Sequence, residues 1–125
     1  MTSKDFQVTF DCAEPERVGS FWCEVLGYEA TVSTESAFAC VDPDGVRPRL
    51  FFQRVPEGKA VKNRVHLDVR VGTGLVGQER LDALEAECVR LEALGAKRGT
   101  LLVADGVNES CQNMQDPEGN EFCLD

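Results

Sequence analysis

A tight turn and a strand-like run stand next to each other in Asp116-Pro117-Glu118-Gly119-Asn120-Glu121-Phe122-Cys123-Leu124. A turn of the same Asp-Pro-acidic-Gly form occurs at residues 42–45, again shortly before a strand-like run. Each turn belongs to a half of the chain that opens with a strand and continues with a helix ending in Leu-Gly. This shared order of elements indicates an internal duplication.

The first half is predicted to fold as β-α-β-β-β. Apolar and polar residues alternate over residues 6–12, which is the pattern of a strand with one polar face. Pro15 suits a first helical turn, because it lacks an amide hydrogen that a helix start leaves unpaired, and Gly27 can supply a left-handed helix end. Between them, apolar residues at helical spacing are Val18, Phe21, Trp22, Val25 and Leu26. Strand-like runs follow at residues 29–33, 37–41 and 49–54.

The second half is predicted to repeat this order after a polar break at residues 56–59. Alternation over residues 65–71 predicts a strand, and a helix is expected near Glu79 to Leu94, with Gly95 at its end. The expected apolar stripe of this helix is Leu81, Leu84, Cys88, Leu91 and Leu94. Strand-like runs near residues 97–104 and 109–115 precede the last strand, which reaches Leu124.

Composition restricts the class of protein. A chain of 125 residues with 42% hydrophobic and 28% charged residues is expected to bury a core as one domain. Its net charge of -9 repels phosphate backbones and anionic membranes, so neither a nucleic acid nor a membrane is an expected partner. The sequence contains neither an apolar run of the roughly 20 residues that cross a bilayer nor a signal-peptide pattern. A cytoplasmic location is therefore expected.

The six cysteines are expected to be free thiols. No CxxC spacing occurs, and nothing in the sequence directs the chain to an oxidising compartment. Most of them lie in apolar runs, where cysteine usually behaves as a small buried hydrophobe. The alternative is a reactive or metal-binding thiol. The positions concerned are Cys12, Cys23, Cys40, Cys88, Cys111 and Cys123.

The chain resembles the vicinal-oxygen-chelate superfamily, of the glyoxalase, bleomycin resistance protein and dioxygenase type, and in particular its glyoxalase-like branch. The motifs that carry the resemblance are Asp11-Cys12-Ala13-Glu14-Pro15, Phe21-Trp22, Leu26-Gly27-Tyr28, Arg64-Val65-His66-Leu67-Asp68, Leu94-Gly95-Ala96 and the segment from Asp116 to Cys123. The resemblance implies an α+β fold in which residues 1–125 form a single domain. Its two βαβββ modules, at about 5–55 and 62–125, would form a curved mixed sheet.

The resemblance also implies a small-molecule pocket on the concave side of this sheet, with the helices on the outer side. The alternation of the strands agrees with such a cup. Residues expected to pack under the helices are Val8, Phe10, Cys12, Val65, Leu67 and Val69. By parity Phe51 faces away from Leu50 and Phe52, and could give the pocket an aromatic wall. Residues expected to contact a ligand are Gln7, Thr9, Phe51, His66, Asp68, Glu121 and Cys123.

A metal site is the less favoured alternative. In metal-dependent relatives the ligands come from the first strand of each half and from late strands, and the resemblance places Gln7 and His66 at two such positions. Cys123 stands where enzymes usually have glutamate, and Phe51 lies near the position used by glyoxalase I. A divalent ion needs a carboxylate, which Glu121 could supply from the same strand face as Cys123. The alternatives are therefore no cofactor, or one Zn, Ni, Fe or Mn ion held by Gln7, His66 and Glu121.

His66 is the only histidine, and its role is open at this stage. It could be a hydrogen-bonded neighbour of Asp68 or Asp11, a ligand contact in a metal-free pocket, or a metal ligand. The equivalent position in the first strand is also open. Counting back from Phe21-Trp22 places Gln7 there, whereas matching residues 8–11 to residues 65–68 places Thr9 there.

Three functions from different classes are considered. The favoured one is a glyoxalase-like protein that binds a small molecule in the cup without a full set of metal ligands. The second is a metal-dependent lyase, isomerase or dioxygenase acting on a substrate with vicinal oxygens. The third is an interaction module without a ligand. Relatives commonly pair their half-cups, so a homodimer is expected.

Overall fold

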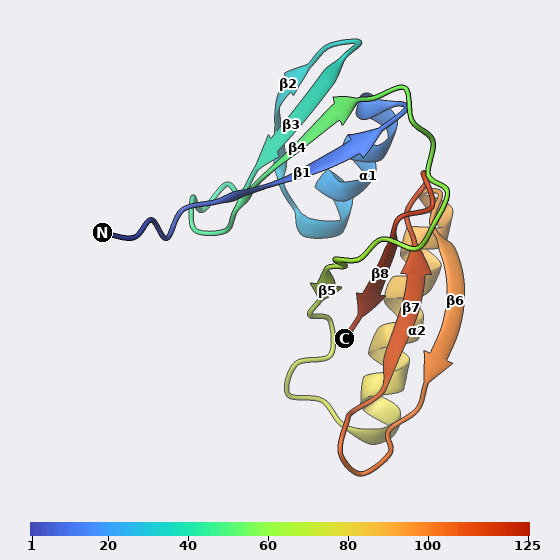
Figure 1. Cartoon of the computed structure of the whole chain (residues 1–125). Helices are drawn as coiled ribbons and strands as arrows, with labels where there is room; N and C mark the ends of the chain where they lie inside the picture. The colour runs from blue at the N-terminus through green and yellow to red at the C-terminus, as the bar shows by residue number, and fades with distance from the viewer. The chain divides into compact units, whose positions relative to one another are not determined.

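The computed structural model describes all residues, 1–125, and divides into two compact units (Figure 1). The first comprises Met1–Ala60 and the second Val61–Asp125. The boundary directly follows the polar break predicted at residues 56–59. None of the helices is both long and apolar enough to cross a membrane.

The first unit contains the five predicted elements. They are β1 (Gln7–Cys12), α1 (Pro15–Leu26), β2 (Glu29–Ser33), β3 (Ala37–Val41) and β4 (Arg49–Arg54). The strands form a mixed sheet in the order β1-β4-β3-β2, with β1 parallel to β4 and the other pairs antiparallel. The predicted bounds of this half are confirmed, apart from Phe6, which lies just outside β1.

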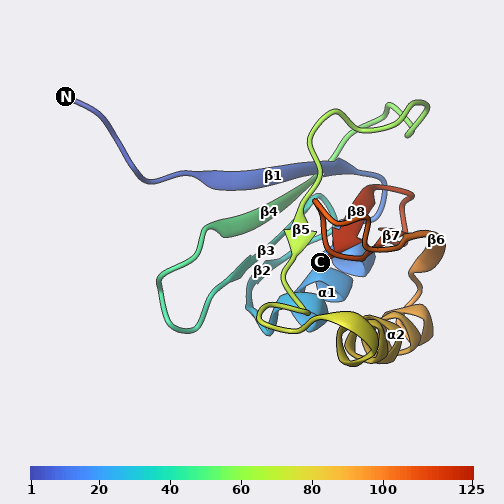
Figure 2. The same ribbon diagram turned by 90° about the horizontal axis from the view of Figure 1, so that it is seen from below.

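The core of the first unit lies between α1 and one face of this sheet (Figure 2). Phe10 connects the two layers, because its ring lies 5.4 Å from that of Trp22 and 4.9 Å from that of Phe52. Gly27 ends α1 with a φ of 67°, the left-handed conformation predicted from the Leu-Gly motif. The buried residues of the helix are Pro15, Val18, Gly19, Phe21, Trp22 and Val25.

The second unit repeats the topology. Its elements are β5 (Asp68–Val69), α2 (Gly77–Ala93), β6 (Lys97–Leu102), β7 (Cys111–Gln115) and β8 (Glu121–Leu124). The sheet order is β5-β8-β7-β6, with β5 parallel to β8 and the other pairs antiparallel. The two βαβββ halves are therefore confirmed. Each half forms its own four-stranded mixed sheet.

The prediction of a strand over residues 65–71 is wrong for most of that range. Only Asp68–Val69 forms a strand, and Val65 is 80% exposed, so it does not pack under a helix. The cause is the side chain of Asn63. Its Oδ1 accepts the backbone N–H of Glu121 at 2.7 Å, and its Nδ2 donates to the backbone oxygen of Val65 at 2.6 Å. A side chain thus takes the hydrogen bond that an extended β5 would have made with β8.

The second helix differs from its prediction at both ends. It begins at Gly77, before Glu79, and Leu94 is 40% exposed although it was placed in the apolar stripe. Arg80 is buried instead, and periodicity missed it because arginine counts as polar. Its guanidinium donates to the backbone oxygens of Ser110 and Gly72 at 2.9 and 2.8 Å, and to Asp125 Oδ1 at 2.7 Å. These bonds satisfy the buried charge.

The last hairpin is shorter than predicted. β6 ends at Leu102 and β7 begins at Cys111, so the connection is longer than the sequence indicated. Asp105 organises the turn, because its Oδ1 accepts the backbone N–H groups of Val107 and Asn108. All six cysteines are free. Cys12, Cys40 and Cys88 are buried as predicted, whereas the other three are half-buried.

Candidate functional site

Each sheet has one face against its helix and a second face that carries polar side chains. In β8, Phe122 and Leu124 are buried, while Glu121 and Cys123 alternate with them and are half-buried. Asp68 is the register partner of Cys123 in the neighbouring β5. This second face, away from the helix, is the face that the alternation predicted as ligand-facing.

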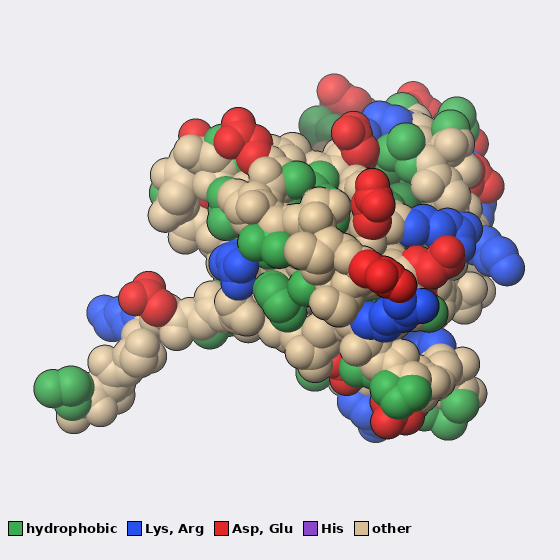
Figure 3. Space-filling model, turned by 90° about the horizontal axis from the view of Figure 1, so that it is seen from above, with side chains coloured by type: hydrophobic (Ala, Val, Ile, Leu, Met, Phe, Trp, Pro, Cys, Tyr) green, Lys and Arg blue, Asp and Glu red, His purple; other side chains and the backbone are tan.

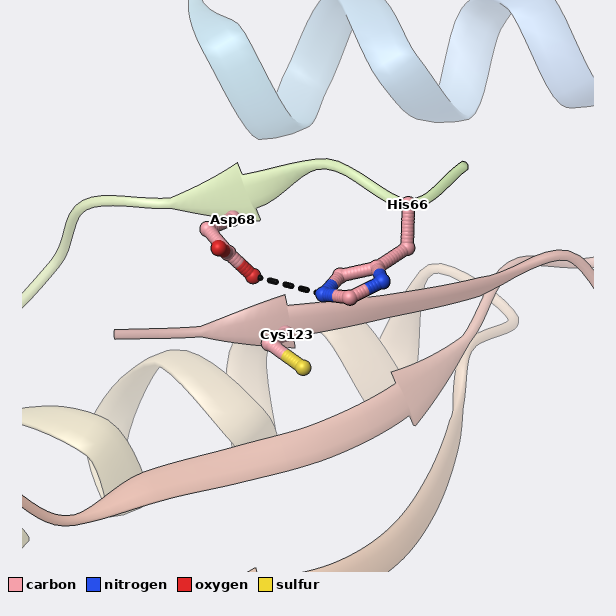
Figure 4. Close-up of side chains that lie close together, drawn as sticks. All are labelled: His66, Asp68 and Cys123. Atoms are coloured by element: carbon pink, nitrogen blue, oxygen red, sulfur yellow. Dashed lines mark ion pairs between the residues drawn. The ribbon is translucent and has the colours of Figure 1, made fainter. Parts of the chain in front are cut away.

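His66, Asp68 and Cys123 lie together in the second unit (Figure 4). His66 stands in the segment before β5, Asp68 in β5 and Cys123 in β8. His66 Nε2 lies 3.1 Å from Asp68 Oδ1, and the potential ligand atoms of all three residues lie within 4.8 Å of one another. His66 therefore contacts Asp68, which was one of the alternatives left open by the sequence.

Cys123 is a protonated thiol at neutral pH. Burial raises its pKa to about 11, and the neighbouring Cys111 and Asp68 act in the same direction. The thiol donates to Asn113 Oδ1 at 3.2 Å. Burial also raises the pKa of Cys111. Because the thiolate is the nucleophile, Cys123 is poorly suited to covalent catalysis in this environment.

The cluster offers one imidazole nitrogen, one carboxylate oxygen and one thiol sulfur. All three are zinc ligands, and three protein ligands are the usual number in catalytic zinc sites. The donor set therefore fits a divalent ion such as zinc, provided that the ion displaces the thiol proton of Cys123. A thiolate suits manganese less well, because manganese prefers oxygen ligands.

The predicted metal set of Gln7, His66 and Glu121 draws on both units. Glu121 is outside the cluster, and its Oε1 accepts the backbone N–H of Asn63 at 3.2 Å. The carboxylate next to His66 is that of Asp68 and not that of Glu121. Gln7 belongs to the first unit. The set with Gln7 and Glu121 stays a prediction.

The polar face of the first sheet carries a second group of side chains. Gln7 and Thr9 are exposed on β1, and their register partners on β4 are Arg49 and Phe51. Phe51 is half-buried on this face, and the neighbouring Leu50 and Phe52 face the core as parity predicted. Sequence reasoning missed Arg49, because a charged residue at the start of a strand carries no pattern of its own.

Arg49 organises this group. Its Nη1 donates to Gln7 Oε1 at 3.0 Å, and its Cζ lies 5.3 Å from the centroid of the Phe51 ring. Gln7 Nε2 in turn donates to Thr9 Oγ1 at 3.3 Å. We call Gln7, Thr9, Arg49 and Phe51 the Arg49 patch.

The strand registers relate the two halves. In β1 and β4 the last pair is Cys12 with Arg54, and in β5 and β8 it is Val69 with Leu124. In each sheet the residue after the last pair then donates its backbone N–H across the two strands. Val55 donates to the oxygen of Cys12 in the first sheet, and Asp125 donates to the oxygen of Val69 in the second. Counting back from these pairs makes Asp11 equivalent to Asp68. The registers therefore favour Thr9, not Gln7, as the equivalent of His66.

A groove of about 800 Å³ lies elsewhere on the first unit, at the start of α1. Its charged side chains include Arg54, which pairs with Glu35 at 3.3 Å, and Arg17, which pairs with Glu14 at 3.4 Å. None of the predicted ligand-binding residues lines it.

Comparison with known proteins gives one family match. The model of the glyoxalase-like domain family matches residues 7–124, which is almost the whole chain. No curated protein sequence matches the chain.

Solved structures share the fold at low sequence identity. A variant of the fosfomycin resistance protein FosX of Listeria monocytogenes, complexed with Mn(II) and 1S,2S-dihydroxypropylphosphonic acid, has a TM-score of 0.74 at 13% identity, covering 99% of this chain and 90% of that one. FosX of Mesorhizobium loti has a TM-score of 0.67 at 15% identity, covering 99% and 92%. A glyoxalase/bleomycin resistance protein/dioxygenase family enzyme from Burkholderia phytofirmans has a TM-score of 0.70 at 12% identity, covering 94% of each chain.

Proposed function

The chain belongs to the glyoxalase-like domain family, and from this membership we propose that it binds a small organic molecule on the polar faces of its sheets without needing a metal ion. One observation carries the proposal: polar side chains and the half-buried Phe51 stand on the faces of the sheets away from the helices, with His66 in the segment before β5. Those residues are Gln7, Thr9, Phe51, His66, Asp68, Glu121 and Cys123.

The chemistry of these side chains suits recognition. Asp68 holds the His66 ring through Nε2, so the imidazole is pre-oriented and costs less entropy to immobilise in a complex. His66 is 41% and Asp68 is 51% exposed, so both are accessible to a ligand. Phe51 adds half-buried apolar surface of the kind that ligand pockets use.

Ligand screening by thermal shift, with and without a chelator, tests the proposal. Ligands are expected to raise the melting temperature equally in both conditions, because binding stabilises the folded state by mass action. His66→Ala should weaken binding, while Glu57→Ala, an exposed change in the polar break, should not. Binding that disappears on chelation would contradict the metal-free proposal.

A metal-dependent lyase, isomerase or dioxygenase is the second candidate. It is favoured by one observation, the approach of the His66, Asp68 and Cys123 donor atoms to within 4.8 Å of one another. These residues would hold a zinc-like ion, with Glu121 of the same unit as a further predicted ligand. A bound ion would polarise vicinal oxygens of a substrate.

Elemental analysis of untagged protein separates the two candidates. One divalent ion per chain that is lost in both His66→Ala and Cys123→Ala would support the metal-dependent enzyme. An ion that survives both substitutions would exclude the cluster as its site. If the protein carries no ion and takes none up from added zinc, the metal-dependent enzyme is excluded and the metal-free proposal is retained.

We also propose that the chain forms a homodimer. β6 is the edge strand of the second sheet, and all of its residues are exposed. Leu101 and Leu102 at its end, with the following Val103, are 45%, 50% and 67% exposed. An unpaired strand edge with apolar side chains is suited to pairing with another chain.

A further inference from the structure

Most arginines of this acidic protein stand beside a carboxylate. The paired ones are Arg17, Arg47, Arg54, Arg70, Arg80, Arg90 and Arg98. On the face shown in Figure 3, most of the Lys or Arg side chains correspondingly lie next to Asp or Glu side chains. Arg49 and Arg64 have no carboxylate within ion-pair distance. Their positive charges are therefore not compensated by a neighbouring side chain.

Arg49 differs from Arg64 in being held in place. Arg64 is an exposed side chain without a hydrogen-bond partner. Arg49 is half-buried, and its guanidinium is fixed by the Gln7 amide oxygen at 3.0 Å and by the Phe51 ring at 5.3 Å. Both partners are neutral, so they orient the guanidinium and leave its charge uncompensated. Five N–H donors are available on a guanidinium, and one bond to Gln7 leaves others free.

The rest of the Arg49 patch supports this orientation. Gln7 Nε2 donates to Thr9 Oγ1 at 3.3 Å, which directs the Gln7 amide oxygen toward Arg49. All four side chains stand on neighbouring strands, in register, on the face that the proposed function uses. A rigid sheet holds such a group more precisely than a loop does.

We infer that Arg49 binds an oxyanion, a carboxylate or a phosphonate, on the small molecule that this protein recognises. The inference rests on the proposed function and names the chemical class of its ligand. In a protein with a net charge of -9, long-range attraction does not favour anions, so a fixed and uncompensated guanidinium is needed. A guanidinium matches the planar geometry of a carboxylate and also binds phosphoryl oxygens.

Isothermal titration of the full chain tests this with three probes on one scaffold: phenylacetate, benzylphosphonate and the neutral phenylacetamide. At least one anion should bind more tightly than the amide, and the tighter one identifies the carboxylate or the phosphonate as the preferred group. Arg49→Gln should weaken anion binding by about tenfold, since it removes a charge-assisted hydrogen bond. Its binding of phenylacetamide should stay unchanged.

Matched variants separate the charge of Arg49 from net charge. Arg90→Gln changes the net charge equally at an exposed site on α2, where Arg90 pairs with Glu87, and should leave anion affinity unchanged. Arg49→Lys should retain part of the affinity, because it keeps the charge and loses the planar fork.

Three results would overturn the role of Arg49. They are equal binding of the anions and the amide, anion affinity that survives Arg49→Gln, and no detectable binding of either anion. The proposed function fails differently, through ligand binding that disappears on chelation. Binding that survives chelation and does not depend on Arg49 would refute this inference alone.

Discussion

The two Asp-Pro-acidic-Gly turns are held by their own aspartates. Asp42 accepts the backbone N–H groups of Asp44 and Arg47, each at 2.9 Å. Asp116 accepts those of Glu118 and Asn120, at 2.9 and 3.0 Å. Both aspartates are buried. The repeated motif is therefore a repeated structural device, in which a carboxylate satisfies the N–H groups of the turn.

Asp42→Asn should lower stability in a pH-dependent way. The backbone N–H groups of Asp44 and Arg47 lower the pKa of Asp42. A carboxylate with a lowered folded pKa stabilises the protein above the ordinary aspartate pKa of about 4, and this contribution is lost as the pH falls through the folded value. The melting temperature of the variant should thus lie below that of the wild type at neutral pH and approach it in acid.

Thermal melts followed by circular dichroism measure this difference. Asp44→Asn is the matched control, because the exposed Asp44 side chain makes no hydrogen bond and should matter little. A constant difference in melting temperature at every pH would show that the charge of Asp42 is not the cause.

Alkylation of Cys123 should be slow at neutral pH. Its pKa of about 11 leaves little thiolate, so the rate of reaction with iodoacetamide should rise with pH up to that value. Asp68→Asn removes a negative neighbour and should shift the rate profile to lower pH. Peptide mass spectrometry resolves Cys123 from the other cysteines. Fast alkylation at neutral pH in the wild type would contradict the assigned environment.

At the scale of elements, α1 packs closely on β3 because Gly19 has no side chain. A Cβ atom added at Gly19 would overlap the ring of Phe38, which is buried in the core. The small residue therefore sets the approach of helix to sheet, whereas the glycine that ends α1, Gly27, is needed for its left-handed backbone.

Gly19→Ala should destabilise the protein, because overpacking a core usually costs about 1–3 kcal/mol. The gain in helix propensity, about 1 kcal/mol, offsets part of this cost. Urea unfolding measures the change. Gly58→Ala is the control, because nothing lies within 4 Å of its added Cβ and its φ is not in the left-handed region. A stabilised Gly19→Ala would mean that Phe38 moves aside freely.

For the whole molecule, the exposed edge at β6 predicts self-association. Leu102→Lys should shift the protein toward the monomer, because it places a charge on an apolar strand edge. Sedimentation velocity at several concentrations measures the change in mass. Val76→Lys, also at an exposed valine, is the control and should leave the mass unchanged. A wild-type monomer at every concentration would refute the homodimer.

The amino-acid sequence by itself determined the order of elements and the family resemblance. Alternation and helical spacing are local patterns, so they placed all strands and the helix of the first unit, and the glycine end of α1. The repeated order of motifs was enough to predict two βαβββ halves. The alternation of strand faces also placed Phe51 on the opposite face from Leu50 and Phe52, as observed.

Only the tertiary structure decided which side chains meet. The Asn63 side chain that shortens β5 bonds Glu121 across 58 positions of sequence, and Arg49 reaches Gln7 across 42. The pairing of His66 with Asp68 was one of several alternatives in the sequence, and the addition of Cys123 follows from the register of β5 on β8. Strand register is set by packing and hydrogen bonds between distant segments, and a shift of one residue would turn every side chain to the opposite face.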